Sequence, residues 1–254
     1  MNLKTLILGV IVVIILVILY YWFFSDADQT TLVSLKDATI AENVDANNVP
    51  KSADFTYSLW VFIKDYNYNY GQEKFILMLP NADNFAASNE FSFQLYLDNF
   101  QSDLICKIRD SVGTAISHTT CKVESIPLQR WTHILVSHRN KALDMYIDGK
   151  LVKTCTLSGP YLMPSGTTAP KLLVCPTAAV AKKSAASTAP NTGPGFRGFL
   201  GNMRYYTRAI QPREAYQIYK EGYTGGNWLS DMFNKYKLKI AFLEDQKELS
   251  SLVL

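Results

Sequence analysis

A run of alternating tyrosine and asparagine is the most suggestive binding feature of this 254-residue sequence. Tyr66, Tyr68 and Tyr70 alternate with two asparagines and precede Gly71, so we expect the run to form a loop. Tyrosine rings offer an apolar surface with a polar tip, and asparagine side chains add adaptable hydrogen bonds. We therefore take the three tyrosines as candidate binding residues, for a glycan or for a protein. The alternative is a loop that only packs over one end of a sheet.

Catalytic chemistry has little support in the sequence. Retaining glycoside hydrolysis needs two carboxyl groups about 5 Å apart, a distance that alternate residues of one strand can provide. The nearest cluster is Glu244, Asp245 and Glu248, and its spacing places Glu244 and Asp245 on opposite faces of a strand. The sequence contains no nucleophile elbow and no Gly-rich phosphate loop. We therefore predict that the protein is not an enzyme.

The histidines and the acidic loops do not predict a metal centre. His133 and His138 project to opposite faces of an extended strand, so they cannot share a metal without a bulge. We expect core or rim positions for them, as for His118. Calcium needs several converging oxygen ligands, and two segments carry such groups: Asp98, Asn99 and Asp103 in one, Asp83, Asn84 and Glu90 in the other. We interpret both as solvated turns and predict no cofactor, with calcium at either turn as the alternative.

Four cysteines, Cys106, Cys121, Cys155 and Cys175, are too few for a disulfide scaffold and have no C-x-x-C spacing. They allow three disulfide pairings, between which the sequence does not choose. Cys106 alternates with Leu104 and Ile108, as a buried free thiol would.

The charge balance excludes some classes of partner. The chain carries 25 Lys and Arg against 22 Asp and Glu, a net charge of +3. This charge is too small to predict a nucleic-acid-binding protein. The aromatic content of 13% argues against general disorder.

The first 25 residues read as a membrane anchor. The segment from Leu6 to Phe24 has no charge and no proline, and its length of roughly 28 Å matches the hydrocarbon core of a bilayer. Tyr20, Tyr21 and Trp22 are suited to the membrane interface. We therefore predict a single-pass membrane protein with residues 1–25 as the anchor. The sequence leaves open which side of the membrane the remainder faces.

The remainder alternates like an antiparallel β-sandwich. Residues 26–52 are interpreted as a linker and a first strand, and residues 53–254 as one domain. Period-two strands are predicted at Phe55–Ile63, Phe91–Leu97, Leu104–Arg109, Ala115–Val123, Trp131–Arg139, Leu143–Asp148, Leu151–Leu157 and Gly198–Thr207, with one more strand in the tail from Tyr236 to Phe242. Asp148-Gly149 predicts a type I′ hairpin turn. Pro212 and Gly222 bound one short C-terminal helix, and Pro176–Gly195 is predicted to be a long exposed loop.

Three segments in order resemble the laminin-G-like branch of the concanavalin A-like jelly rolls. They are Asp54–Val61, Trp131–Val136 followed by Met145–Lys150, and Gly198–Ile210. The resemblance implies a jelly roll of two packed antiparallel sheets. It also implies a range of roles, which includes glycan binding, protein interaction, hydrolysis and structural support, and in many members a calcium ion at a sheet rim. Membrane-anchored versions resembling this chain occur in virions of large DNA viruses.

From these features we predict a non-catalytic, membrane-anchored structural or interaction module. Its expected task is to tie a membrane, such as a virion membrane, to a protein assembly such as a viral capsid. The expected partners are the membrane and other protein chains, and not nucleic acid. The alternative is a surface lectin or adhesin that binds glycans.

Overall fold

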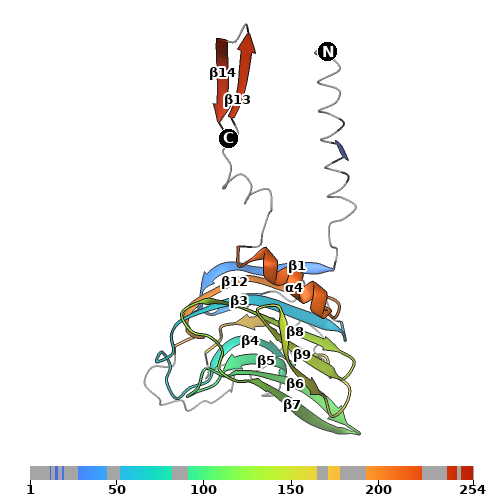
Figure 1. Cartoon of the computed structure of the whole chain (residues 1–254). Coiled ribbons are helices and arrows are strands. Elements are labelled where there is room, and N and C mark those ends of the chain that lie inside the picture. Colours follow the sequence, from blue (N-terminus) through green and yellow to red (C-terminus); the bar gives the residue numbers. More distant parts are fainter. Residues whose placement is uncertain are drawn as a thin grey trace.

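Two six-stranded antiparallel sheets form the body of the protein (Figure 1). The structure is a computed structural model. It describes residues 28–44, 52–81, 91–164, 171–177 and 193–224, the backbone of residues 239–244 and 247–253, and four residues near the N-terminus, Val12, Ile15, Leu16 and Leu19. The predicted antiparallel β-sandwich with one short C-terminal helix is confirmed.

The first sheet has the strand order β1-β12-β3-β8-β9-β10. Its strands are β1 (Gln29–Asp37), β12 (Arg197–Tyr206), β3 (Phe55–Asp65), β8 (Trp131–Arg139), β9 (Ala142–Ile147) and β10 (Lys150–Thr156). The second sheet has the order β2-β11-β4-β5-β6-β7. Its strands are β2 (Glu42–Val44), β11 (Leu172–Val174), β4 (Lys74–Pro80), β5 (Phe91–Leu97), β6 (Leu104–Val112) and β7 (Ala115–Val123).

The core lies between the two sheets and follows the period-two pattern of the sequence. On β3, the alternating residues from Phe55 to Ile63 are almost fully buried, and they meet Phe93, Leu95 and Leu97 of β5. Burial of these large apolar side chains stabilises the fold by roughly 1.5–3 kcal/mol for each side chain that is fully buried.

The opposite face of β5 is buried too, which the alternation of Ser92, Gln94 and Tyr96 did not predict. Tyr96 packs against Phe75 at a ring separation of 5.1 Å, within a second apolar cluster that also holds Met78 and Ile105. The alternating polar residues therefore lie on the outer face of the sheet, but this face is not exposed to solvent.

Helix α4 (Pro212–Glu221) covers part of the outer face of the first sheet, as Figure 1 shows. Pro212 stands at its start, Glu214 in its first turn and Gly222 at its end, as predicted. Ala215 and Ile218 are buried against a cluster on the sheet, formed by Leu135, Tyr146, Tyr206 and Ile210.

The hairpin between β9 and β10 has the predicted type I′ character, since Asp148 and Gly149 both have positive φ, at 49° and 73°. A Cβ atom at Gly149 would lie 2.9 Å from Cβ of Tyr219 and 3.0 Å from Cα of Tyr216. Gly149 therefore permits both the turn and the close approach of α4.

The predicted anchor falls almost entirely outside the described residues, as do Tyr20, Tyr21 and Trp22. Among the residues that the structure describes, no helix is long and apolar enough to cross a membrane. In the tail, β13 (Lys239–Glu244) pairs with β14 (Lys247–Val253) in a two-stranded sheet of their own. The predicted tail strand thus has a counterpart at Lys239–Glu244, but this strand does not join either large sheet.

Candidate binding site

The loop between β3 and β4 carries the three candidate tyrosines, and Asn69 holds it in place. Asn69 has a positive φ of 54°, which asparagine tolerates better than most residues. Its side-chain amide donates to the carbonyl of Gly193 at 2.8 Å, and its Oδ1 accepts from the amide of Gly193 at 3.1 Å. The loop is therefore fastened to the end of the predicted Pro176–Gly195 loop, where Thr177 and Pro194 form an isolated bridge.

Tyr66 is part of the framework of this end of the sandwich. Its hydroxyl donates to the carbonyl of Asp98 at 2.6 Å and also contacts the carbonyl of Gln101. The ammonium of Lys74, a buried residue, lies 4.2 Å from the centre of its ring. Burial raises the pKa of Tyr66 and lowers the pKa of Lys74 to about 8. These contacts leave Tyr66 little freedom to meet a ligand.

Tyr70 lies on the surface and is 63% exposed. Its ring meets that of Phe100 edge-on, at a centre-to-centre distance of 5.6 Å. Phe100 is 57% exposed, so the two rings form a small aromatic contact on the surface.

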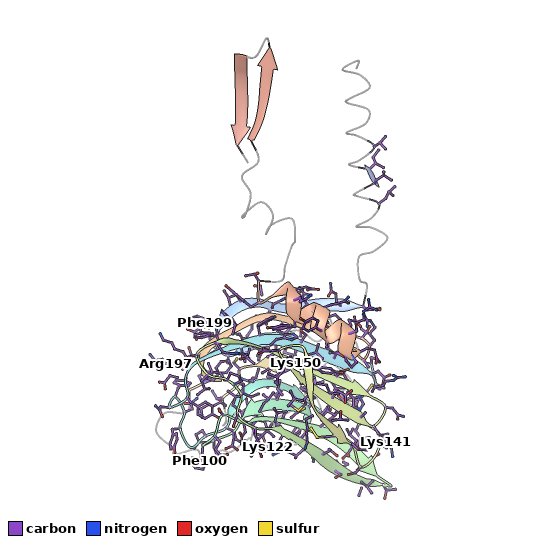
Figure 2. The ribbon with its side chains drawn as sticks, viewed as in Figure 1. Phe100, Lys122, Lys141, Lys150, Arg197 and Phe199 are labelled. Atoms are coloured by element: carbon purple, nitrogen blue, oxygen red, sulfur yellow. A yellow bond between two sulfur atoms is a disulfide. The ribbon has the colours of Figure 1, made fainter. Side chains whose placement is uncertain are left out.

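Tyr68 lines a cavity of about 500 Å³, which we call the Tyr68 cavity. Its other lining residues come from three strands and the turn after β1: Asp37, Thr39, Lys64, Arg197, Gly198 and Phe199. Figure 2 shows Arg197 and Phe199 next to each other at one end of the sandwich. The three tyrosines of the sequence pattern thus lie in three different environments, and only Tyr68 borders this cavity.

The walls of the Tyr68 cavity are set by pairing between β3 and β12. Arg197 is the register partner of Asp65, and Gly198 is the partner of Ile63. Since Ile63 and Phe196 point into the core, the adjacent Lys64 and Arg197 project outward. A Cβ atom at Gly198 would lie 1.9 Å from the carbonyl oxygen of Phe62, so no other residue fits without a backbone shift.

Of the charged residues that line the cavity, Asp37 accepts hydrogen bonds, whereas the two cations have no ion-pair partner among the described residues. Oδ1 of Asp37 accepts hydrogen bonds from the amide and the hydroxyl of Thr39, at 2.8 and 2.7 Å. These bonds, and more weakly Arg197, lower the pKa of Asp37. Within the described part of the chain, neither Lys64 nor Arg197 forms an ion pair.

An aromatic strip on the outer face of the first sheet leads away from the cavity. It consists of Phe199, Phe62, Trp131 and Tyr223. The ring centre of Phe62 lies 6.4 Å from that of Phe199 and 5.7 Å from that of Trp131. Trp131 stacks on Tyr223 with their ring centres 4.6 Å apart. Phe199 is 42% exposed and belongs to both the strip and the cavity.

One pair of side chains resembles a nucleophile and its base, but it is sealed. Nε2 of His133 lies 2.9 Å from the hydroxyl oxygen of Ser58. Ser58 is 1% and His133 0% exposed, beneath the aromatic residues Trp60 and Tyr219. Burial lowers the pKa of His133 to about 3. The pair therefore belongs to the packing between the first sheet and α4.

The other histidines are accounted for by packing. His138 is buried, and its Nδ1 lies 2.8 Å from the carbonyl oxygen of Ala53. His118 is exposed on β7, with its ring 4.6 Å from that of Phe91. The expected core position is confirmed for His133 and His138, whereas His118 lies exposed on an edge strand.

In the first candidate calcium segment, the side chains of Asp98 and Asp103 already have partners within the chain. Oδ2 of Asp98 accepts from the amides of Phe100 and Gln101, and Asp103 pairs with Lys122 at 2.7 Å. Asp83, Asn84 and Glu90 lie outside the described residues. Within the described ranges, no three His, Cys, Asp or Glu side chains are grouped to hold a metal ion.

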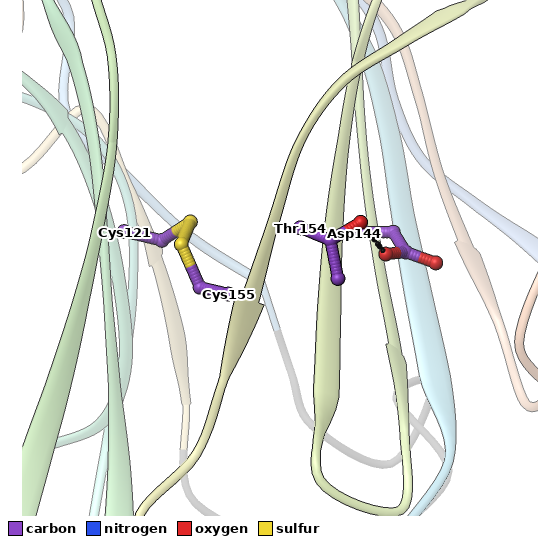
Figure 3. Close-up of a disulfide and its surroundings, with 4 residues drawn as sticks. All are labelled: Cys121, Asp144, Thr154 and Cys155. Carbon is purple, nitrogen blue, oxygen red and sulfur yellow. Dashed lines mark hydrogen bonds between the residues drawn. A yellow bond between two sulfur atoms is a disulfide. The ribbon is translucent and has the colours of Figure 1, made fainter.

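The structure selects one disulfide among the pairings that the sequence left open. Cys121 and Cys155 are bonded, with their Cα atoms 5.9 Å apart (Figure 3). Cys121 belongs to β7 and Cys155 to β10, so the bond joins the edge strands of the two sheets. Cys106 and Cys175 are free and buried. Burial raises the pKa of Cys106, and that of Cys175 to about 12, so both thiols stay protonated and inert.

Sequence reasoning identified Tyr68 but missed the charged residues beside it. Lys64 and Arg197 are 133 positions apart in the numbering, so no local motif joins them. The available signal was indirect. The segments Asp54–Val61 and Gly198–Ile210 belong to strands that pair in the structure, and extending that pairing by a few residues brings Lys64 to Arg197.

Comparisons with known proteins identify the family. A family model, Laminin_G_3, described as the concanavalin A-like lectin/glucanases superfamily, matches residues 36–215. The CBM40 of the Ruminococcus gnavus IT-sialidase, solved with α2,3-sialyllactose, superposes with a TM-score of 0.53 and 12% identity, over 75% of this chain and 96% of that one. An HCR/D mutant superposes with a TM-score of 0.51 and 10% identity, over 76% of this chain and 42% of that one.

The chain therefore spans less than half of the length of the HCR/D chain. No curated protein matches the sequence. At these low identities the two solved structures show the fold alone. The family model covers well over half of the chain and includes all three motifs found in the sequence up to Ile210. The chain belongs to the concanavalin A-like lectin/glucanases superfamily.

Proposed function

We propose that the protein is a non-catalytic binding module that is held at a membrane and takes a carbohydrate in the Tyr68 cavity. The observation that carries this proposal is the cavity itself. Its volume of about 500 Å³ lies within the usual range for sites that hold small ligands. The aromatic rings of Tyr68 and Phe199 border it beside the hydrogen-bonding groups of Asp37, Thr39 and Arg197. Five of the seven lining residues are charged or carry a hydroxyl group, and this polar lining suits a hydrophilic ligand such as a sugar.

The position of the cavity supports the same proposal. Lys64 and Arg197 stand on paired strands, and a site built on strands is held more precisely than one built on loops alone. Tyr68 is fixed because the neighbouring Asn69 is bonded to Gly193. The CBM40 that shares the fold was solved with a bound sugar, which favours a carbohydrate over other small ligands.

The membrane part of the proposal rests on residues 6–24, whose apolar sequence is long enough to span a bilayer. The disulfide between Cys121 and Cys155 adds a preference for one side. Disulfides persist in oxidising environments and are rare in the cytosol. We therefore place the sandwich on the oxidising side of the membrane that anchors it.

A second candidate function is supported by the aromatic strip. Exposed aromatic residues are enriched at protein interfaces, where a few of them carry most of the binding energy. Phe199 and Tyr223 are exposed, with Phe62 and Trp131 between them. A module that ties a membrane to a protein assembly, such as a viral capsid, would use such a surface.

The experiment uses the full chain in bilayer nanodiscs of neutral lipid, tested against an array of neutral and acidic glycans. The variant Tyr68→Ala should lower the affinity for a bound glycan at least about fivefold, because truncation removes a ring that borders the ligand. Tyr70→Ala is the matched control, since Tyr70 lies on the same loop but does not border the cavity. If no glycan binds, or if both variants bind as the parent does, the carbohydrate proposal fails.

The assembly function has its own test. Tyr223→Ser changes the aromatic strip without touching the cavity lining. Loss of co-purifying protein partners in Tyr223→Ser, with glycan binding absent throughout, would favour the second candidate.

A further inference from the structure

We infer that the sugar bound in the Tyr68 cavity is an acidic one, whose carboxylate is held by Arg197 and Lys64. This inference rests on the proposed function and specifies its ligand. The key observation is that two cationic side chains border one cavity and that, among the described residues, neither has an ion-pair partner. An arginine guanidinium can donate two parallel hydrogen bonds to a carboxylate.

Three arginines on or beside the first sheet differ from Lys64 and Arg197. Arg130 pairs with Asp148, Arg204 pairs with Glu221, and Arg208 pairs with Glu214. Each of these charges is neutralised by a nearby carboxylate of the chain itself. Lys64 and Arg197 instead face a space that a ligand can enter.

Asp37 adds a second requirement to negative charge: the ligand should also carry a hydroxyl group that donates a hydrogen bond. Both of its hydrogen bonds from Thr39 go to Oδ1. Among the described residues Oδ2 has no hydrogen-bond donor, so it can accept from a sugar hydroxyl. Sulfate has no hydrogen-bond donor for this oxygen and is repelled by its charge. A ligand with both a carboxylate and hydroxyl groups satisfies the cations and Asp37 together.

The aromatic residues complete the match. Tyr68 and Phe199 border the cavity and offer apolar ring surface to the C–H groups of a sugar ring. The cavity thus combines three features that suit an acidic sugar: a cationic contact for the carboxylate, an acceptor for hydroxyl groups, and two aromatic residues.

The test compares each acid with its uncharged methyl ester, which keeps the shape and removes the charge. The probes are the methyl glycosides of glucuronate, galacturonate and N-acetylneuraminate, each with its ester, titrated into the full chain in neutral nanodiscs and followed by ligand-observed NMR. At least one acid should bind at least about tenfold more tightly than its ester, as expected for a hydrogen bond to a charged group. Added salt should weaken binding of the acid and leave binding of the ester unchanged.

Three variants identify the residues. Arg197→Gln should lower the affinity for the acid at least about tenfold. Lys64→Gln should lower it about 1.5- to 5-fold, because an exposed point charge contributes less. Lys141→Gln is the control. It removes an exposed lysine at the opposite end of the sandwich (Figure 2), and it should not change the affinity. All three side chains are exposed, so the thermal midpoint should stay unchanged.

The outcomes separate this inference from the proposed function. Equal binding of acid and ester, with loss of both in Tyr68→Ala, would overturn the inference and keep a carbohydrate-binding cavity. An acid preference that survives Arg197→Gln would also overturn it. If inorganic phosphate or vesicles of an anionic phospholipid bind in an Arg197-dependent manner and no sugar acid does, the site is a phosphate site and both proposals fail.

Discussion

Breaking the bond between Cys121 and Cys155 is expected to destabilise the sandwich strongly. The two cysteines are 34 positions apart, and the bond joins the edge strands β7 and β10, which belong to different sheets. In the chain-entropy model, closing a loop of this length lowers the conformational entropy of the unfolded chain by about 12.6 cal/mol/K. At 298 K this corresponds to about 3.8 kcal/mol of the free energy of unfolding. The free energy of unfolding of a typical domain is only about 5–15 kcal/mol.

The measurement is urea unfolding of the full chain in mild detergent, for the parent and for Cys121→Ala/Cys155→Ala. With a slope near 2 kcal/mol per molar urea, the midpoint should fall by about 2 M. Alanine avoids placing a hydroxyl at the fully buried position of Cys121. The parent with reductant is the matched control, and its urea midpoint should fall to that of the double variant. The midpoint of the double variant should not change when reductant is added.

Two results would refute this reasoning. A parent midpoint that does not respond to reductant would mean that the bond adds no stability or does not form. A double variant that still responds to reductant would mean that Cys106 or Cys175 takes part in a bond. Peptide mapping without reduction would then show which cysteine it is.

Three further predictions concern the hairpin, a buried histidine and the anchor. Gly149→Ala should lower the thermal midpoint more than Gly113→Ala; both glycines have positive φ, but only at Gly149 would the new Cβ meet α4 within 3.0 Å, and equal shifts would contradict the close approach of α4. Burial holds His133 neutral with a pKa of about 3, so the unfolded chain binds a proton that the folded chain does not once the pH falls below about 6.5. Stability should therefore fall between pH 7 and pH 5, and His133 should account for about 2 kcal/mol of this loss; pH-dependent urea titrations of His133→Gln should show a smaller loss, and an unchanged slope would be evidence against the buried neutral ring. Ile14→Asp should weaken membrane insertion by roughly 2.5–3.5 kcal/mol in a carbonate-extraction assay, and full retention in the membrane would argue against the anchor.

Strand positions could be predicted from the sequence because the core of a sandwich imposes a period of two on each strand. Phe55 to Ile63 on β3 and Phe93 to Leu97 on β5 show this directly. The short strands β2 and β11 escaped prediction because three residues are too few to show a period. The strand β4 also escaped, since its buried residues on both faces erase the alternation.

The candidate site was less predictable than the fold, and for a different reason. Tyr68 could be selected from composition, but composition gave no reason to separate it from Tyr66 and Tyr70. Their different environments depend on contacts with Asp98, Phe100 and Arg197, which are distant in sequence. The disulfide partner of Cys121 is fixed in the same way, since the pairing follows from which edge strands meet.

The strand order of the first sheet also constrains how the chain reaches its native state during synthesis. β12 lies between β1 and β3, and it pairs Gln29 with Tyr206. A growing chain can pair β3, β8, β9 and β10 well before β12 has been made. Until then β1 has no neighbour and one edge of β3 is unpaired. Pairing across such a sequence separation is slow, and bare strand edges invite association with other chains. We therefore expect a chaperone to be most needed in the interval between the emergence of β1 and that of β12.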